Sequence, residues 1–136
     1  MEIIFICLIF LVIGVILLVI AARRRGQKFS KRDLNLIHGE WHQINKKVQS
    51  QPNNALMEAD RLLDFVLKRL GYTGSLGDKL KKAEKEFSNL DAVWSAHKLR
   101  NKVAHEVGFS VSQDSLNNAL KAFKQAFFDL GVLGKS

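Results

Sequence analysis

The chain has 136 residues, a formal net charge of +8 and a single cysteine. An apolar run takes up the first 22 residues, so about 110 remain, enough for one modest domain with one core but not for two. Because the cysteine, Cys7, lies inside the apolar run, an intrachain disulfide framework and a thiolate metal cluster are both excluded. This cysteine usage fits a reducing compartment.

The apolar run predicts a transmembrane helix over residues 1–22. No charged residue occurs from Ile3 to Ala22, and a helix of that length rises about 30 Å, the hydrocarbon thickness of a bilayer. A cleaved secretory signal is the alternative interpretation. Glu2 argues against it, because such a signal has a positive residue there, and so do the arginines directly after Ala22.

Residues 23–32 are predicted to be a basic juxtamembrane linker, because they hold six of the 21 basic residues. Positive residues beside a span are retained inside the cell, so we expect a single-pass protein of the cell membrane with its C-terminal domain in the cytoplasm. From Asp33 onward, 15 basic and 12 acidic residues leave a net charge of only +3. The total charge is therefore weak evidence for nucleic-acid binding, and anionic headgroups are the expected contact of Arg23, Arg24, Arg25, Lys28, Lys31 and Arg32.

Residues 33–136 predict an all-α fold, an up-and-down bundle of four or five helices. Ser30 and Asp33 have the spacing of a capping box at a helix start. A second helix ends at Gly71, with Asp60 and Asp64 expected on its exposed side. No run alternates with the period of a strand, and there is only one proline. The predicted apolar positions of these two helices are Leu34, Ile37, Trp41, Ile44, Val48, Leu56, Ala59, Leu63, Val66 and Leu70.

Three further helices are predicted in the second half of the chain. Ser75 and Asp78 have capping-box spacing before a short basic helix, and Ser88 with Asp91 repeats the pattern before a helix over about residues 89–107. The last helix begins near Ser112. Its apolar stripe consists of Leu116, Leu120, Phe123, Phe127 and Leu130, and Gly131 follows it.

Polar side chains occupy what should be a packing stripe of the helix over residues 89–107. Val93, His97, Asn101 and His105 form a nearly continuous line, and Arg100 lies beside it. Each polar group would raise the free energy of the folded state if it were buried without a partner. The cluster must therefore be paired, solvated or at an interface.

The segment from Leu99 to His105, with sequence LRNKVAH, resembles the motif of HEPN domains. In that family an Arg and a following polar residue precede a His by four to six intervening residues. The resemblance covers about residues 53–130 and implies a small helical bundle that, in catalytic members, cleaves RNA without metal at a cleft between two subunits. One branch has a tyrosine where this chain has Val107, so the sequence departs from that branch.

The resemblance makes Arg100 and His105 the candidate catalytic residues, with Asn101 orienting one of them. His97, from the polar line of the same helix, is a candidate binding residue. An imidazole can move a proton near neutral pH, and a guanidinium can bind phosphate oxygens at two points. The alternative is an ordinary amphipathic helix. In that case Arg100 pairs with a nearby carboxylate and His105 is a cation favoured by the helix C-terminus.

Other patterns predict no metal and no cofactor. His38 and His42 lie one turn apart, but Gly39 stands where a zinc-protease helix has Glu, and no third ligand is evident. Two functions remain as expectations: a membrane-anchored RNase or RNA-binding protein acting in defence or stress, or a non-enzymatic, membrane-tethered interaction or dimerisation module. The expected partners are the membrane, a second copy of the chain and RNA.

Overall fold

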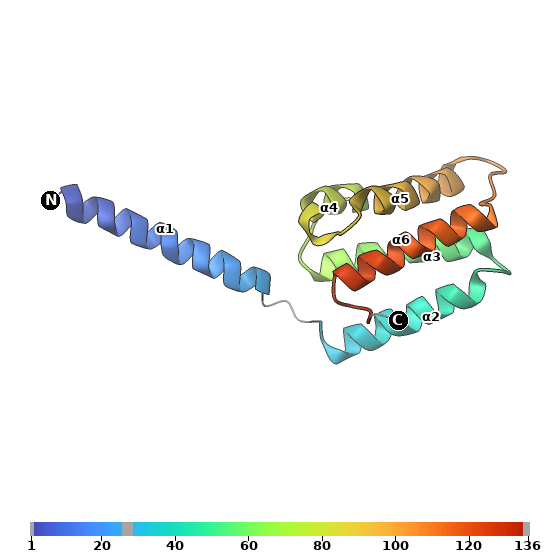
Figure 1. The fold of residues 1–136 in the computed structure, drawn as a ribbon, viewed down its shortest axis with the longest axis horizontal. Coiled ribbons are helices and arrows are strands. Elements are labelled where there is room, and N and C mark those ends of the chain that lie inside the picture. Colours follow the sequence, from blue (N-terminus) through green and yellow to red (C-terminus); the bar gives the residue numbers. More distant parts are fainter. Residues whose placement is uncertain (1, 26–28, 135–136) are drawn as a thin grey trace.

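The computed structural model describes residues 2–25 and 29–134, and within them it is helical, without strands. The predicted all-α class is thus confirmed (Figure 1). The elements are α1 (Glu2–Arg25), α2 (Lys31–Lys47), α3 (Pro52–Arg69), α4 (Leu76–Lys82), the 3-10 helix η1 (Glu84–Glu86), α5 (Leu90–His105) and α6 (Gln113–Asp129).

Helix α3 is the centre of the bundle, because it packs against α2, α4, α5 and α6. Figure 1 shows α2, α3, α5 and α6 running alongside one another, and α5 also packs on α6. Phe123 and Phe127 of α6 are the largest fully buried side chains. Trp41 of α2 meets the Phe127 ring edge-on, with 5.3 Å between ring centroids. The predicted apolar stripe of α6 is buried along its whole length.

Two of the three serines predicted from capping-box spacing cap their helices, and Ser112 caps α6. Ser30 Oγ accepts a hydrogen bond from Asp33 N at 3.0 Å. Ser75 and Asp78 form a full capping box, and the Ser75 hydroxyl and backbone N–H bonds lower the pKa of Asp78. Gly71, with φ of 89°, lies at the predicted end of α3, where only glycine adopts this conformation without strain.

The predicted pairing of Ser88 with Asp91 is wrong. Asn89 caps α5 instead, by accepting a hydrogen bond from Ala92 N at 3.1 Å. Ser88 donates from both its backbone N–H and its hydroxyl to Asp129 Oδ2, each at 2.8 Å. The serine is therefore used for a contact between the start of α5 and the end of α6, which local spacing does not reveal.

The side chains of α1 are described for residues 6–18, and the large apolar ones among them are exposed. Within the described residues, no helix combines the length and the apolar character needed to cross a membrane. The span predicted for residues 1–22 stays a prediction. Residues 26–28 of the basic linker lie outside the described residues.

Asp129 is expected to stabilise the bundle in a pH-dependent way. Burial acts to raise its pKa, but the two bonds from Ser88 and one from Gln125 outweigh that effect and lower it below the usual 3.8. The stabilisation is therefore present above about pH 4 and lost as pH falls through the lowered pKa. Asp129→Asn should lower the free energy of unfolding by about 0.5–1 kcal/mol at pH 7, after allowance for solvent screening.

Urea unfolding of the full chain in detergent micelles from pH 7 to pH 3 would measure this difference. The difference in free energy of unfolding between wild type and Asp129→Asn should shrink toward zero near pH 3. Glu40→Gln, at an exposed position of α2, is the control and should leave stability unchanged at every pH. A constant difference between wild type and Asp129→Asn across the range would contradict the assignment.

Candidate functional site

The polar cluster of α5 is organised around one buried carboxylate. Asp60, on α3, is only 3% exposed, so the prediction that it lies on the exposed side of its helix is wrong. The physical reason is visible in the spacing. Asp60 follows Leu56 by four residues and precedes Leu63 by three, and such neighbours share a helix face. Both leucines are fully buried.

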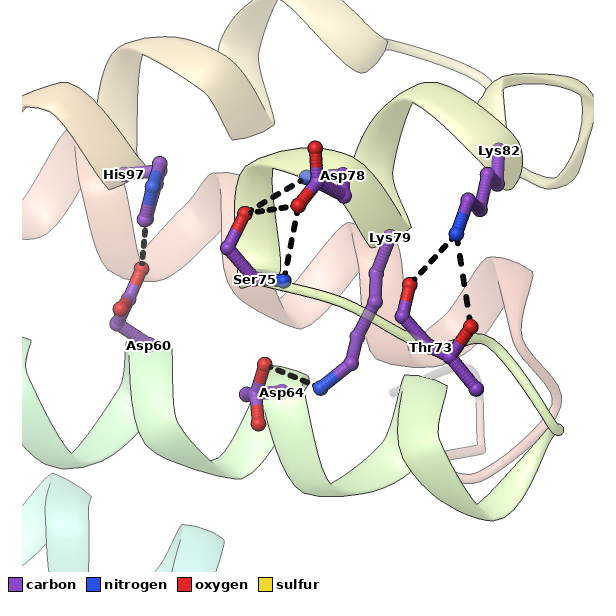
Figure 2. Close-up of polar contacts among 8 residues, drawn as sticks. All are labelled: Asp60, Asp64, Thr73, Ser75, Asp78, Lys79, Lys82 and His97. Atoms are coloured by element: carbon purple, nitrogen blue, oxygen red, sulfur yellow. Dashed lines mark hydrogen bonds and ion pairs between the residues drawn. The ribbon is translucent and has the colours of Figure 1, made fainter.

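Two residues of α5 meet this carboxylate. His97 Nδ1 lies 2.7 Å from Asp60 Oδ1 (Figure 2), and the His97 side chain is 13% exposed. Arg100 Nε lies 3.2 Å from Asp60 Oδ2, an ion-pair distance, although this buried nitrogen has no hydrogen-bond partner. The Arg100 side chain is 29% exposed. Of the three alternatives for the polar cluster of α5, pairing applies to His97 and Arg100, and their partner lies on α3.

Asn101 closes the cluster into a ring of four side chains. Arg100 Nη1 donates to Asn101 Oδ1 at 3.0 Å, and Asn101 Nδ2 lies 3.4 Å from His97 Nε2. Together with the contacts at Asp60, these bonds connect Asp60, His97, Asn101 and Arg100 in sequence. We call this set the Asp60 ring.

The hydrogen-bonding roles in the Asp60 ring follow from Arg100, because a guanidinium can only donate. The Asn101 atom facing it must therefore be the oxygen, so the amide nitrogen faces His97. His97 Nε2 must then accept, which leaves the proton on Nδ1 for donation to Asp60. The ring thus requires a neutral His97, an ionised Asp60 and a cationic Arg100. Its charges sum to zero.

A second ion pair lies one helical turn along α3. Lys79 of α4 is only 4% exposed and donates to Asp64 Oδ1 at 2.7 Å (Figure 2). Asp60 and Asp64 therefore hold α5 and α4, respectively, against the same helix. Lys82 of α4 contacts the Thr73 backbone oxygen at 2.8 Å.

His105, the candidate general acid or base, is not part of this arrangement. It is exposed in the last turn of α5, and no hydrogen bond or ion pair of His105 occurs within residues 29–134. Five residues separate it from Arg100, which corresponds to about 140° around the helix axis. The structure brings Arg100, Asn101 and His97 together but leaves His105 on another face.

His38 of α2 contacts the backbone of the segment after α6. His38 Nε2 lies 2.9 Å from the Val132 backbone oxygen, to which it can donate, so this histidine links α2 to the segment after α6. Among the described residues, no group of three or more His, Cys, Asp or Glu side chains could hold a metal ion.

Searches for related proteins give no support for a family. No family model, curated protein or solved structure matches this chain.

Asp60 is expected to be the most sensitive polar position of the bundle. Asp60→Asn keeps the shape but leaves Arg100 without its counter-charge, so the free energy of unfolding should fall by about 2–4 kcal/mol. Glu58→Gln is the matched control on the same helix, because it removes the Lys47–Glu58 pair, whose side chains are 34% and 31% exposed, and should cost less than about 1 kcal/mol. Urea unfolding of the full chain in detergent would compare them. Equal losses of unfolding free energy in Asp60→Asn and Glu58→Gln would show that the Asp60 ring contributes no more to stability than the Lys47–Glu58 pair.

Proposed function

We propose that this protein is a membrane-anchored, non-enzymatic interaction module, with a HEPN-like helical bundle on the cytoplasmic side that binds a second copy of the chain. The observation that carries the proposal is the Asp60 ring. The arginine and asparagine of the motif bind each other, and the arginine also pairs with a buried carboxylate.

This arrangement favours binding over catalysis on two grounds. A guanidinium that clamps phosphate needs its charge and its planar edge available, whereas Arg100 pairs with Asp60 and donates from Nη1 to Asn101. A general acid or base must also reach the same reacting atoms as the phosphate clamp. Within one chain, Arg100 and His105 lie about 140° apart around α5.

The anchor is proposed for α1 and rests on the sequence. Its apolar residues run without a charge from Ile3 to Ala22, and the arginines follow directly. The described apolar side chains of α1 are exposed, as lipid-facing residues would be. Attachment confines the bundle to two dimensions and raises its effective concentration, so even a weak dimer can form.

The end of α5 is the surface proposed for the second copy. Ala104, His105 and Val107 are all exposed there, and Val107 is fully exposed. Packing of a partner on this end of α5 would remove the apolar surface of Val107 from water.

A metal-independent RNase that acts as a homodimer is the second candidate. The observation that favours it is the exposure of His105 next to the HEPN-like residues. In a dimer, His105 of one chain could serve a site with Arg100 of the other, and RNA would then be the substrate.

Membrane attachment can be tested by placing a charge in the apolar run. Ile13→Arg should release a large share of the protein from the membrane fraction, because an arginine at mid-span costs about 2.5–3.5 kcal/mol. Leu36→Arg, at an exposed apolar position of α2, is the matched control and should stay in the membrane fraction. A C-terminal tag should resist protease added to intact cells. Wild type in the soluble fraction, or digestion of the tag, would contradict the proposal.

Crosslinking of membrane-bound protein can test the proposed function. In a Cys7→Ser background, Ala104→Cys should form a disulfide-linked dimer when oxidised, because α5 of one copy would face α5 of the next. Asn118→Cys, at an exposed position of α6, is the control and should remain largely monomeric.

The RNase alternative predicts a different outcome in the same samples. Wild type would cleave RNA in the presence of EDTA, and His105→Ala would abolish cleavage with stability unchanged within about 0.5 kcal/mol. That result would overturn the non-enzymatic proposal. Absence of cleavage together with a dimer specific to Ala104→Cys would support it.

A further inference from the structure

One member of the Asp60 ring, the imidazole of His97, can take up a proton on its second ring nitrogen. The donor and acceptor roles of the other side chains in the ring follow from Arg100, which can only donate hydrogen bonds. His97 Nε2 must accept a hydrogen bond from Asn101 Nδ2 across 3.4 Å, and a protonated imidazole cannot accept one. Protonation of His97 is therefore incompatible with the ring as it stands.

Rotation of the Asn101 amide cannot repair the ring. Turning the amide by 180° would offer its oxygen to the new N–H of His97, but it would then point the amide N–H groups at Arg100 Nη1, also a donor. One of the two contacts, His97–Asn101 or Asn101–Arg100, must be lost. Rotation exchanges the 3.0 Å bond of Arg100 to Asn101 for a bond from His97 to the Asn101 oxygen, and without rotation the 3.4 Å contact of Asn101 with His97 is lost.

The electrostatic interactions of the ring also oppose protonation of His97. With His97 protonated, the ring would carry a net charge of +1, and two cations would share the one carboxylate of Asp60. The other charges nearby do not compensate, because Asp64, the next acidic residue of α3, is paired with Lys79 of α4. Within the described residues, the hydrogen-bond, ion-pair and ring contacts of His97 are with Asp60, Asn101 and the edge of the Trp94 ring.

Arg100 is the member that can leave. Its side chain is 29% exposed, against 13% for His97 and 4% for Asp60, and its Nε has no hydrogen bond to lose. We propose that His97 is a proton-operated latch on Arg100: a proton on His97 Nε2 draws the Asn101 oxygen toward His97, which breaks the Asn101–Arg100 contact and releases the guanidinium toward solvent. Its use in regulating a partner rests on the proposed interaction function, but the release itself does not.

The latch can be tested without any partner, so its failure is distinguishable from failure of the proposed function. The full chain in detergent micelles, labelled with ¹⁵N, is titrated from about pH 8 to pH 5 while the side-chain NMR signals of His97, Asn101 and Arg100 are followed. The three signals should shift together with one midpoint. The rate of Arg100 Nε–H exchange with solvent, divided by the rate for the other arginines, should be at least several-fold higher at about pH 5 than at about pH 8.

Two variants and one control make the outcome decisive. His97→Gln cannot take up a proton, so the Arg100 signal should become independent of pH. Asn101→Ala should free Arg100 Nη1 at all pH values and uncouple it from His97. His105→Gln removes the exposed histidine of the same helix and should leave the wild-type response intact. An Arg100 signal that ignores the His97 titration in wild type, or a response that is lost in His105→Gln, would overturn the latch.

Discussion

The arrangement of α5 on the bundle depends on placing one carboxylate, Asp60, inside an otherwise apolar face of α3. Removing a charge from water costs several kcal/mol, and the cost is recovered only when opposite charges and hydrogen bonds surround it. His97 and Arg100 supply them from α5. The bond network therefore specifies which turn of α5 meets which turn of α3, which apolar contacts alone specify less sharply. Leucine and alanine at these positions would permit several neighbouring registers.

The interior polar groups also explain why α5 looks unusual for a bundle helix. Only Val93 and Ala96 of α5 are fully buried, whereas α6 buries seven residues. Its larger apolar residues, Trp94, Leu99 and Val103, pack against the core but are only partly buried, so polar contacts add to the attachment of the helix. The ion pairs to α3 do so near the middle of α5, and packing on α6 holds its other side. The end of the helix around His105 has neither and faces solvent.

Much of the fold could be predicted from the sequence because it is encoded locally. The serine caps before α2 and α4, the glycine after α3 and the apolar stripe of α6 each depend on residues a few positions apart. The Asp60 ring joins α3 to α5 through residues 37 and 40 positions apart, and only its three members on α5 were predicted to form a cluster. Asp60 could have been found, since it lies between Leu56 and Leu63 on a buried face. Ser88 could not, because its partner Asp129 lies 41 positions away.

The burial of Lys79 gives the small helix α4 a chemical property that its neighbours lack. Lys81, Lys82 and Lys85 are exposed, so amine-reactive reagents can reach them at all times. Lys79 becomes reachable only when α4 separates from α3 and the bond to Asp64 opens. The rate at which Lys79 is modified, relative to these three lysines, thus reports how often α4 opens locally, and mass spectrometry can read it from the covalent product.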